Sequence, residues 1–161
     1  MTNDTSIRHA ASWRQWTLAP AALALAAVSV PYLLTHGLVA AFALQRAFSI
    51  ICHQRPERCF WIFGAPVAVC ARCLGIYVGA AIGLLLRTSR SIAMRLLVVA
   101  AFVNLLDAVN EAAGLHGNWM TARFVLGFAL GAAAALLISS SMQSSAVLVS
   151  NQVPQRLDNT N

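Results

Sequence analysis

Long apolar runs constrain this chain more than any other feature of its sequence. Four of them cover about residues 18–44, 67–86, 92–115 and 119–138, with short polar stretches between them. The chain is 59% hydrophobic and only 10% charged, and its mean hydropathy is +0.70, which is too apolar for an ordinary soluble domain. Lipid offers backbone groups no hydrogen-bond partner, so each run is expected to be a helix. The sequence therefore predicts an all-α integral membrane bundle of about four transmembrane helices.

Composition divides the chain into three segments. A polar N-terminal segment covers residues 1–17, the transmembrane domain covers 18–138, and a tail rich in Ser, Asn and Gln covers 139–161. The tail is expected to be disordered beyond its first few residues. Pro31 lies inside the first apolar run and predicts a kink there.

Arginines are the only cationic side chains besides histidine, and they account for a net charge of +6. Most lie at the ends of apolar runs, which favours lipid headgroups as partners and argues against nucleic acid. Four spans would place both termini on one side and the Gly114–Asn118 loop on the other. Arginines near the termini favour cytoplasmic termini when those interleaved with cysteines are discounted. We expect a bacterial inner (plasma) membrane protein, either as a homo-oligomer or with another membrane protein as partner.

All four cysteines lie in the stretch Cys52–Tyr77, the Cys-rich motif of residues 52–77. Cys70 and Cys73 are three residues apart at the start of the second run, so a helix places them on one face near its N-terminal end. The helix dipole and the intervening Arg72 favour the thiolate, which binds metals and attacks disulfides. The motif is therefore predicted to form a Cys/His-rich site at one membrane face.

Two chemistries fit this motif. A thiophilic metal, for which the donor types favour zinc, would take Cys70 and Cys73 as one half-site and Cys52, with His53 or Cys59, as the other. A redox enzyme would instead use Cys70 and Cys73 as a reversible disulfide, with Cys52 and Cys59 as a shuttle pair and a quinone as cofactor. That layout is similar to vitamin K epoxide reductase and bacterial disulfide-forming membrane enzymes.

Two further questions stay open at this point. His53 is either a ligand, a base that activates Cys52, or a hydrogen-bonding residue at the membrane surface. The whole motif is also compatible with a non-catalytic assembly or interaction protein in which the cysteines only tie the loop to the bundle. Whether the protein is an enzyme is therefore not decided by its sequence.

A polar stripe interrupts the third apolar run. Asn104, Asp107 and Glu111 recur on one helix face, with Asn110 beside them. Ionisable groups in a span should face the bundle interior and have partners, and Arg123 is a natural partner for Asp107 or Glu111. The stripe is either a structural ion-pair network or, with His116, a complement to the cysteine site. The predicted network comprises Arg58, Arg72, Asp107, Asn110, Glu111, Asn118 and Arg123.

Glycines at four-residue spacing predict close helix packing. Gly75, Gly79 and Gly83 form one such series in the second run, and Gly127 and Gly131 form another in the fourth.

These residues together resemble a known family. The residues that carry the resemblance are Cys52-His53-Gln54, Pro56-Glu57-Arg58, Phe60, Gly64, the run from Val69 to Tyr77, Gly79, Asp107, Gly114, Asn118, Arg123, Gly127 and Gly131. They look like the signature of small prokaryotic membrane proteins classed as domain of unknown function 2085, over about residues 45–135. The family pattern often has serine at the position of Cys59 and threonine at that of Leu74. The resemblance thus favours Cys52, His53, Cys70 and Cys73 as ligands, with Cys59 as an additional candidate, and implies no activity.

Overall fold

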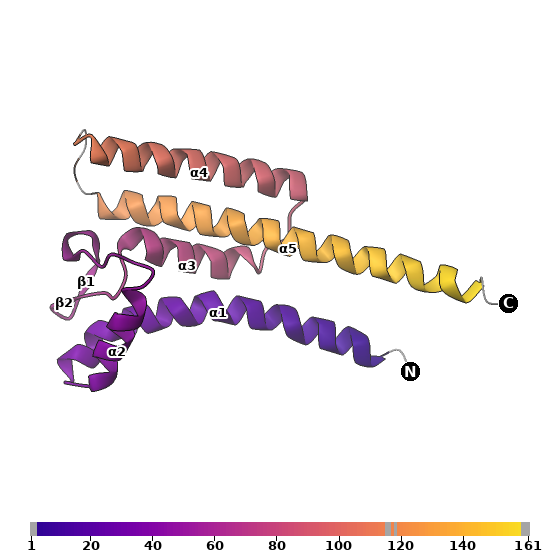
Figure 1. Cartoon of the computed structure of the whole chain (residues 1–161), viewed down its shortest axis with the longest axis horizontal. Helices are drawn as coiled ribbons and strands as arrows, with labels where there is room; N and C mark the ends of the chain where they lie inside the picture. The colour runs from indigo at the N-terminus through magenta and orange to yellow at the C-terminus, as the bar shows by residue number, and fades with distance from the viewer. Residues whose placement is uncertain (1–2, 115–116, 118, 159–161) are drawn as a thin grey trace.

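The computed structural model describes residues 3–114, 117 and 119–158, with side chains described within 18–114, 117 and 119–141 (Figure 1). The described part is mostly helical, as predicted. Its short elements are a 3-10 turn at Pro56–Arg58 and a hairpin of strands β1 (Trp61–Ile62) and β2 (Ala65–Pro66). Its α-helices are α1 (Asn3–Thr35), α2 (Val39–Phe48), α3 (Ala71–Gly83), α4 (Arg90–Ala112) and α5 (Met120–Asp158).

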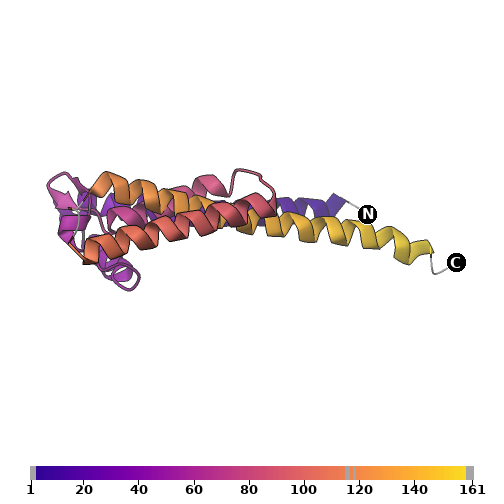
Figure 2. The same ribbon diagram turned by 90° about the horizontal axis from the view of Figure 1, so that it is seen from above.

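Helices α1, α3, α4 and α5 run along one long axis, with α3 between α1 and α5 (Figures 1 and 2). Helix α2 and the hairpin lie at one end of this axis, together with the end of α4 and the start of α5. Both chain termini lie toward the other end (Figure 1). The cysteine motif thus lies at the same end of the axis as the end of α4 and the start of α5, and the start of α1 and the end of α5 lie toward the opposite end.

Among the described residues, three helices are long and apolar enough to cross a membrane, so the predicted count of four spans is not confirmed. They are the Leu18–Thr35 part of α1, the whole of α4, and the Met120–Ser141 part of α5. The predicted span over 67–86 contains only α3, whose 13 residues rise about 20 Å against roughly 30 Å of hydrocarbon. The apolar run is longer than α3 for two reasons. Val67–Val69 are apolar because protein, and not lipid, buries them, and Leu84–Leu86 form a turn after the helix.

The first apolar run is also divided. Helix α1 ends at Thr35, and Gly37 follows with a φ of +65°. The N–H of Gly37 donates to the carbonyl of Leu34, and that of Leu38 donates to Leu33, each at 3.0 Å. This is a Schellman motif, which ends a helix with a glycine in the left-handed region. The chain then turns into α2 instead of continuing as one span to residue 44.

Pro31 creates a docking point for the cysteine loop. Proline has no N–H, so the carbonyl of Ala27 lacks its usual donor within α1. The N–H of Ala68 donates to this oxygen at 3.3 Å. Ala27 lies eight residues before the end of α1 at Thr35, which corresponds to about 12 Å along the helix. The segment Val67–Val69 therefore enters the bundle, where irregular backbone is tolerated because protein buries it.

Helices α3 and α5 pack backbone to backbone. A methyl group at Gly75, Gly79 or Gly83 would overlap with a carbonyl oxygen of α5, and one at Gly127 or Gly131 would overlap with a carbonyl oxygen of α3. Each helix thus fits its glycines against the other's peptide groups, as the four-residue spacing predicted. This contact fixes the start of α3, and with it Cys70 and Cys73, against α5.

The terminal helices reach beyond the predicted transmembrane domain. Helix α1 already begins at Asn3 and α5 continues to Asp158. Helix α5 therefore passes through most of the tail, for which the sequence predicted disorder. Extending an existing helix is much easier than nucleating one, so a polar segment can continue the apolar helix that precedes it.

Candidate metal centre

Three cysteines from two separate elements meet near the start of α3. Cys52 follows the C-terminal end of α2, Cys70 is the residue before α3, and Cys73 lies in the first turn of α3. Their Sγ atoms all lie within 4.8 Å of one another. We call these residues the cysteine trio. The trio comprises three of the cysteines that the sequence nominated for both chemistries.

Backbone hydrogen bonds hold the trio in place. The N–H of Cys52 donates to the carbonyl of Phe48 at 2.9 Å and so continues the last turn of α2. The N–H of Cys70 donates to the Sγ of Cys52 at 3.2 Å. Gln54 has a φ of +48°, and its side-chain amide donates to the carbonyl of Gln45 at 2.7 Å, which turns the loop back over α2. A hydrogen bond thus joins Cys52 to the start of α3 without the help of a metal ion.

The surroundings of Cys52 favour its thiolate form. Hydrogen bonds from the thiols of Cys70 and Cys73 lower the pKa of Cys52 far below that of a free thiol, and the backbone N–H of Cys70 adds to this effect. Burial acts in the opposite direction, since Cys52 is only 4% exposed. A thiolate is the form in which cysteine binds metal and attacks disulfides.

The trio fits a thiophilic metal ion. In a tetrahedral zinc site with Zn–S bonds of about 2.3 Å, sulfur atoms lie about 3.8 Å apart, so the observed spread of up to 4.8 Å needs only a small contraction. No fourth Cys, His, Asp or Glu joins this group within the described side chains. The geometry therefore offers three protein sulfurs and leaves a fourth coordination position to a water or another ligand.

Cys59 is placed differently from the trio. It is 1% exposed, and its Sγ donates to the carbonyl of Arg55 at 3.2 Å. Burial, with smaller contributions from the charges of Cys52, Cys70 and Glu57, raises the pKa of Cys59 to about 11. It is thus a neutral thiol with a backbone partner. All four cysteines are free of disulfides in this structure.

His53 does not join the trio either. Cys52 is buried and His53 is exposed, as expected where an extended chain sends adjacent side chains to opposite sides. The ligand set that the geometry supports is therefore smaller than the four-ligand set favoured by the sequence. A sequence pattern records that two residues are adjacent but not which way each one points.

The polar stripe of α4 binds arginines from three other elements. Arg72 of α3 pairs with Asp107. Glu111 pairs with Arg58 of the loop at 2.6 Å and with Arg123 of α5 at 2.5 Å. The guanidinium groups of Arg58 and Arg72 therefore engage carboxylates of the polar network in which the sequence placed them, and Arg72, which was also expected to favour the thiolates, binds Asp107. These ion pairs tie the cysteine loop and α3 to α4 and α5.

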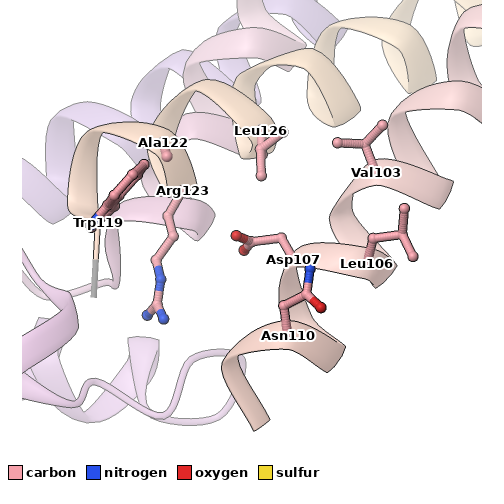
Figure 3. Close-up of a pocket in the computed structure, with 8 residues that line it drawn as sticks. All are labelled: Val103, Leu106, Asp107, Asn110, Trp119, Ala122, Arg123 and Leu126. Carbon is pink, nitrogen blue, oxygen red and sulfur yellow. The ribbon is translucent and has the colours of Figure 1, made fainter. Parts of the chain in front are cut away.

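The remaining predicted residues fall into two groups. Asn110 is exposed and lines a pocket between α4 and α5 (Figure 3). His116 and Asn118 lie outside the described residues.

The docking of Ala68 on Ala27 was not predicted from the sequence. A proline within a predicted span is nevertheless a usable signal, because it frees the carbonyl four residues earlier.

Two archaeal proteins are similar to this chain in sequence. An uncharacterized protein of Methanocaldococcus jannaschii, MJ1492, is 36% identical over 95 residues, which are 55% of this chain and 61% of that protein. An uncharacterized protein of Methanothermobacter thermautotrophicus is 54% identical over 33 residues, 20% of this chain and 30% of that protein. The chain thus spans less than two thirds of each relative. Both organisms are archaea, so these comparisons do not support the expected bacterial source.

No solved structure matches this chain. The sequence model of the family described as "Predicted membrane protein (DUF2085)" matches residues 52–137. The matched region starts at Cys52 and contains the trio, the glycine contact between α3 and α5, and the ion pairs of α4. With more than half of its length covered, this chain belongs to the DUF2085 family of predicted membrane proteins, as its sequence motifs indicated.

Proposed function

We propose that this protein is a small integral membrane protein that binds a thiophilic metal ion, zinc by preference, through Cys52, Cys70 and Cys73. The observation that carries the proposal is the approach of three Sγ atoms from two separate elements to within 4.8 Å. The N–H bond from Cys70 to the sulfur of Cys52 supports it, because such bonds stabilise thiolates. The membrane is proposed to be the plasma membrane, with cytoplasmic termini and the trio facing outward.

The position of the trio suggests what the metal does. Bound metal would link the loop after α2 to the first turn of α3, at the point where Val67–Val69 enter the bundle. Such a link is structural, because it holds irregular backbone at membrane depth. A fourth position open to exchange would also suit a sensory or transport role, since an incoming ligand could bind there without displacing a cysteine.

Metal analysis of variants tests this proposal. The purified full-length protein is expected to contain about one zinc per chain, and Cys70→Ser should lose it. Cys59→Ser is the matched control, because it makes the same change at a buried cysteine outside the trio and should keep the metal. Metal-free wild-type protein, or equal loss in both variants, would contradict the proposal.

A thiol-disulfide oxidoreductase is the second candidate, and the observation that favours it is the approach of the free Sγ atoms of Cys70 and Cys73 to within 4.8 Å of each other. In this reaction Cys70 and Cys73 would form a disulfide and release two electrons and two protons, which would reduce a membrane quinone to the quinol. Thiol trapping in quinone-containing membranes tests it. A Cys70–Cys73 disulfide that appears only with quinone would support it, and thiols that resist alkylation until a chelator is added would support the metal.

Both candidates share one further test, which concerns a purely structural role. If replacing all four cysteines with serine left the fold and the cellular role intact, the protein would serve assembly or interaction instead. In that case the ion pairs and glycine contacts alone would hold the loop to the bundle.

A further inference from the structure

A second candidate site lies between α4 and α5, and no cysteine of the trio lines it. It is a pocket of about 360 Å³. In Figure 3, the polar side chains of Asp107, Asn110 and Arg123 gather toward one side, while Val103, Leu106 and Leu126 lie toward the other. The complete lining is Val103, Leu106, Asp107, Asn110, Trp119, Ala122, Arg123 and Leu126.

The polar end of the pocket lies near the membrane surface. Trp119 directly precedes α5 and is 69% exposed, the position and exposure typical of an interfacial tryptophan. Asn110 is close to the end of α4 at Ala112, whereas Val103 is about two helical turns deeper. The pocket therefore runs from headgroup level toward the hydrocarbon, in the orientation of a lipid.

Hydrogen-bond donors dominate the polar end. The side chain of Arg123 is 5% exposed, and its buried Nε has no hydrogen-bond partner among the described residues. The Asn110 amide and the Trp119 indole N–H add donors. Asp107 is the acidic member of the lining, and its carboxylate is engaged by Arg72 from the α3 side. A ligand headgroup with acceptor oxygens fits these groups.

The charge balance selects an anionic headgroup over a neutral one. The ion pairs between α4 and its neighbours join three arginines, Arg58, Arg72 and Arg123, to two carboxylates, Asp107 and Glu111. Among these five described side chains, the arginines outnumber the carboxylates by one. A surplus charge at the edge of the hydrocarbon layer favours a counter-charge beside it.

We propose that this pocket binds the phosphate headgroup of an anionic membrane lipid, with Arg123 and Asn110 at the phosphate and one hydrocarbon chain against Val103, Leu106 and Leu126. The site is independent of the metal proposal, because it uses no cysteine. It is nevertheless connected to the trio, since Asp107 pairs with Arg72, the neighbour of Cys73. A lipid bound here would stabilise the ion pairs that hold α3 to α4.

Lipid binding to the full-length protein, measured by native mass spectrometry in detergent, tests the proposal. Phosphatidylglycerol should bind as one molecule per chain, about tenfold more tightly than phosphatidylcholine with the same chains. Val103→Trp should remove this preference by filling the pocket. Val98→Trp is the matched control on α4, because Val98 is 60% exposed and lies outside the lining, and this variant should keep the preference.

Asn110→Ala is a second test variant, which keeps the proposal testable if Val103→Trp fails to fold. Asn110 is exposed, so its truncation should leave the fold intact and weaken phosphatidylglycerol binding by about threefold. Equal binding of the two lipids, or unchanged preference in Val103→Trp and Asn110→Ala, would overturn the proposal. Displacement of the lipid by inorganic phosphate would identify a free-phosphate site, and displacement by a quinone would identify a neutral headgroup. Either displacement would also overturn it.

Discussion

Helix α5 contacts α3 and α4 in two different ways. Against α3 it packs glycines onto peptide groups, so that no side chain separates the two backbones. Against α4 it is joined by side chains: the Glu111–Arg123 ion pair and the hydrogen bond from Asn104 to the carbonyl of Leu126 at 2.9 Å. We call these the glycine contact and the polar contact. The first has no spare volume, whereas the second encloses a pocket.

The difference suggests that the two contacts serve different functions. The cysteine trio needs sulfur positions that stay fixed, and two of its members begin α3, the helix held by the glycine contact. A pocket needs walls that can accommodate a ligand, and side chains can change rotamer where peptide groups cannot move. Mutations in the glycine contact should therefore be the more damaging.

The largest effect is expected for Gly79→Ala. The added methyl group would overlap with the carbonyl oxygen of Phe128, which belongs to a helix backbone and cannot rotate away. We expect destabilisation above about 4 kcal/mol or loss of folded protein, the range associated with severe overpacking. Thermal unfolding in detergent measures this.

Gly117→Ala makes the same change where there is room. The nearest atoms to its added methyl group would be those of Trp119, at 3.8 Å. The expected change is within about 0.5 kcal/mol. Similar unfolding temperatures for the Gly79→Ala and Gly117→Ala proteins would show that the glycine contact is not rigid.

An intermediate effect is expected for Glu111→Gln in the polar contact. The change keeps the shape of the side chain but removes the charge that faces Arg58 and the nearly buried Arg123. Leaving a buried charge without its partner costs about 3 kcal/mol. The same unfolding assay applies, with Asn110→Ala, a truncation at an exposed position of the same helix, as control. A loss no larger than that of the control would mean that the ion pairs are only loosely formed.

Among changes within the two helix contacts, the smallest effect is expected for Asn104→Ala. This side chain donates to the carbonyls of Ala100 and Leu126, each at 2.9 Å. Hydrogen bonds between transmembrane helices contribute about 0.6 kcal/mol on average, so the loss should be about 1 kcal/mol or less. A loss as large as that of Gly79→Ala would remove the distinction between the two contacts.

Features that depend on spacing along one helix could be predicted from the sequence. The glycine series of α3 and α5 and the polar stripe of α4 are patterns of that kind, and the structure places both against partners. The approach of Cys52 to Cys70 and Cys73 was also anticipated, because thiols in such a spacing are typical of one site. Helix type followed from apolar composition alone.

Features that depend on contacts between distant segments could not be predicted in this way. The short length of α3 follows from burial of Val67–Val69 against α1, and hydropathy does not distinguish burial in protein from burial in lipid. The break at Gly37 does not show in the hydropathy of the run, because apolar segments precede and follow the short stretch Thr35-His36-Gly37. The exposure of His53 depends on the course of one loop. For α3 the deciding partner, α1, is remote in sequence.

X-ray absorption spectroscopy at the zinc edge tests the central claim most directly. In the purified full-length protein the metal should be surrounded by three sulfur atoms at about 2.3 Å and one lighter atom at about 2.0 Å. The same spectrum is expected for Cys59→Ser. A site with four sulfurs would bring Cys59 into the ligand set, and one with two or fewer, or protein without metal, would contradict a centre built from Cys52, Cys70 and Cys73.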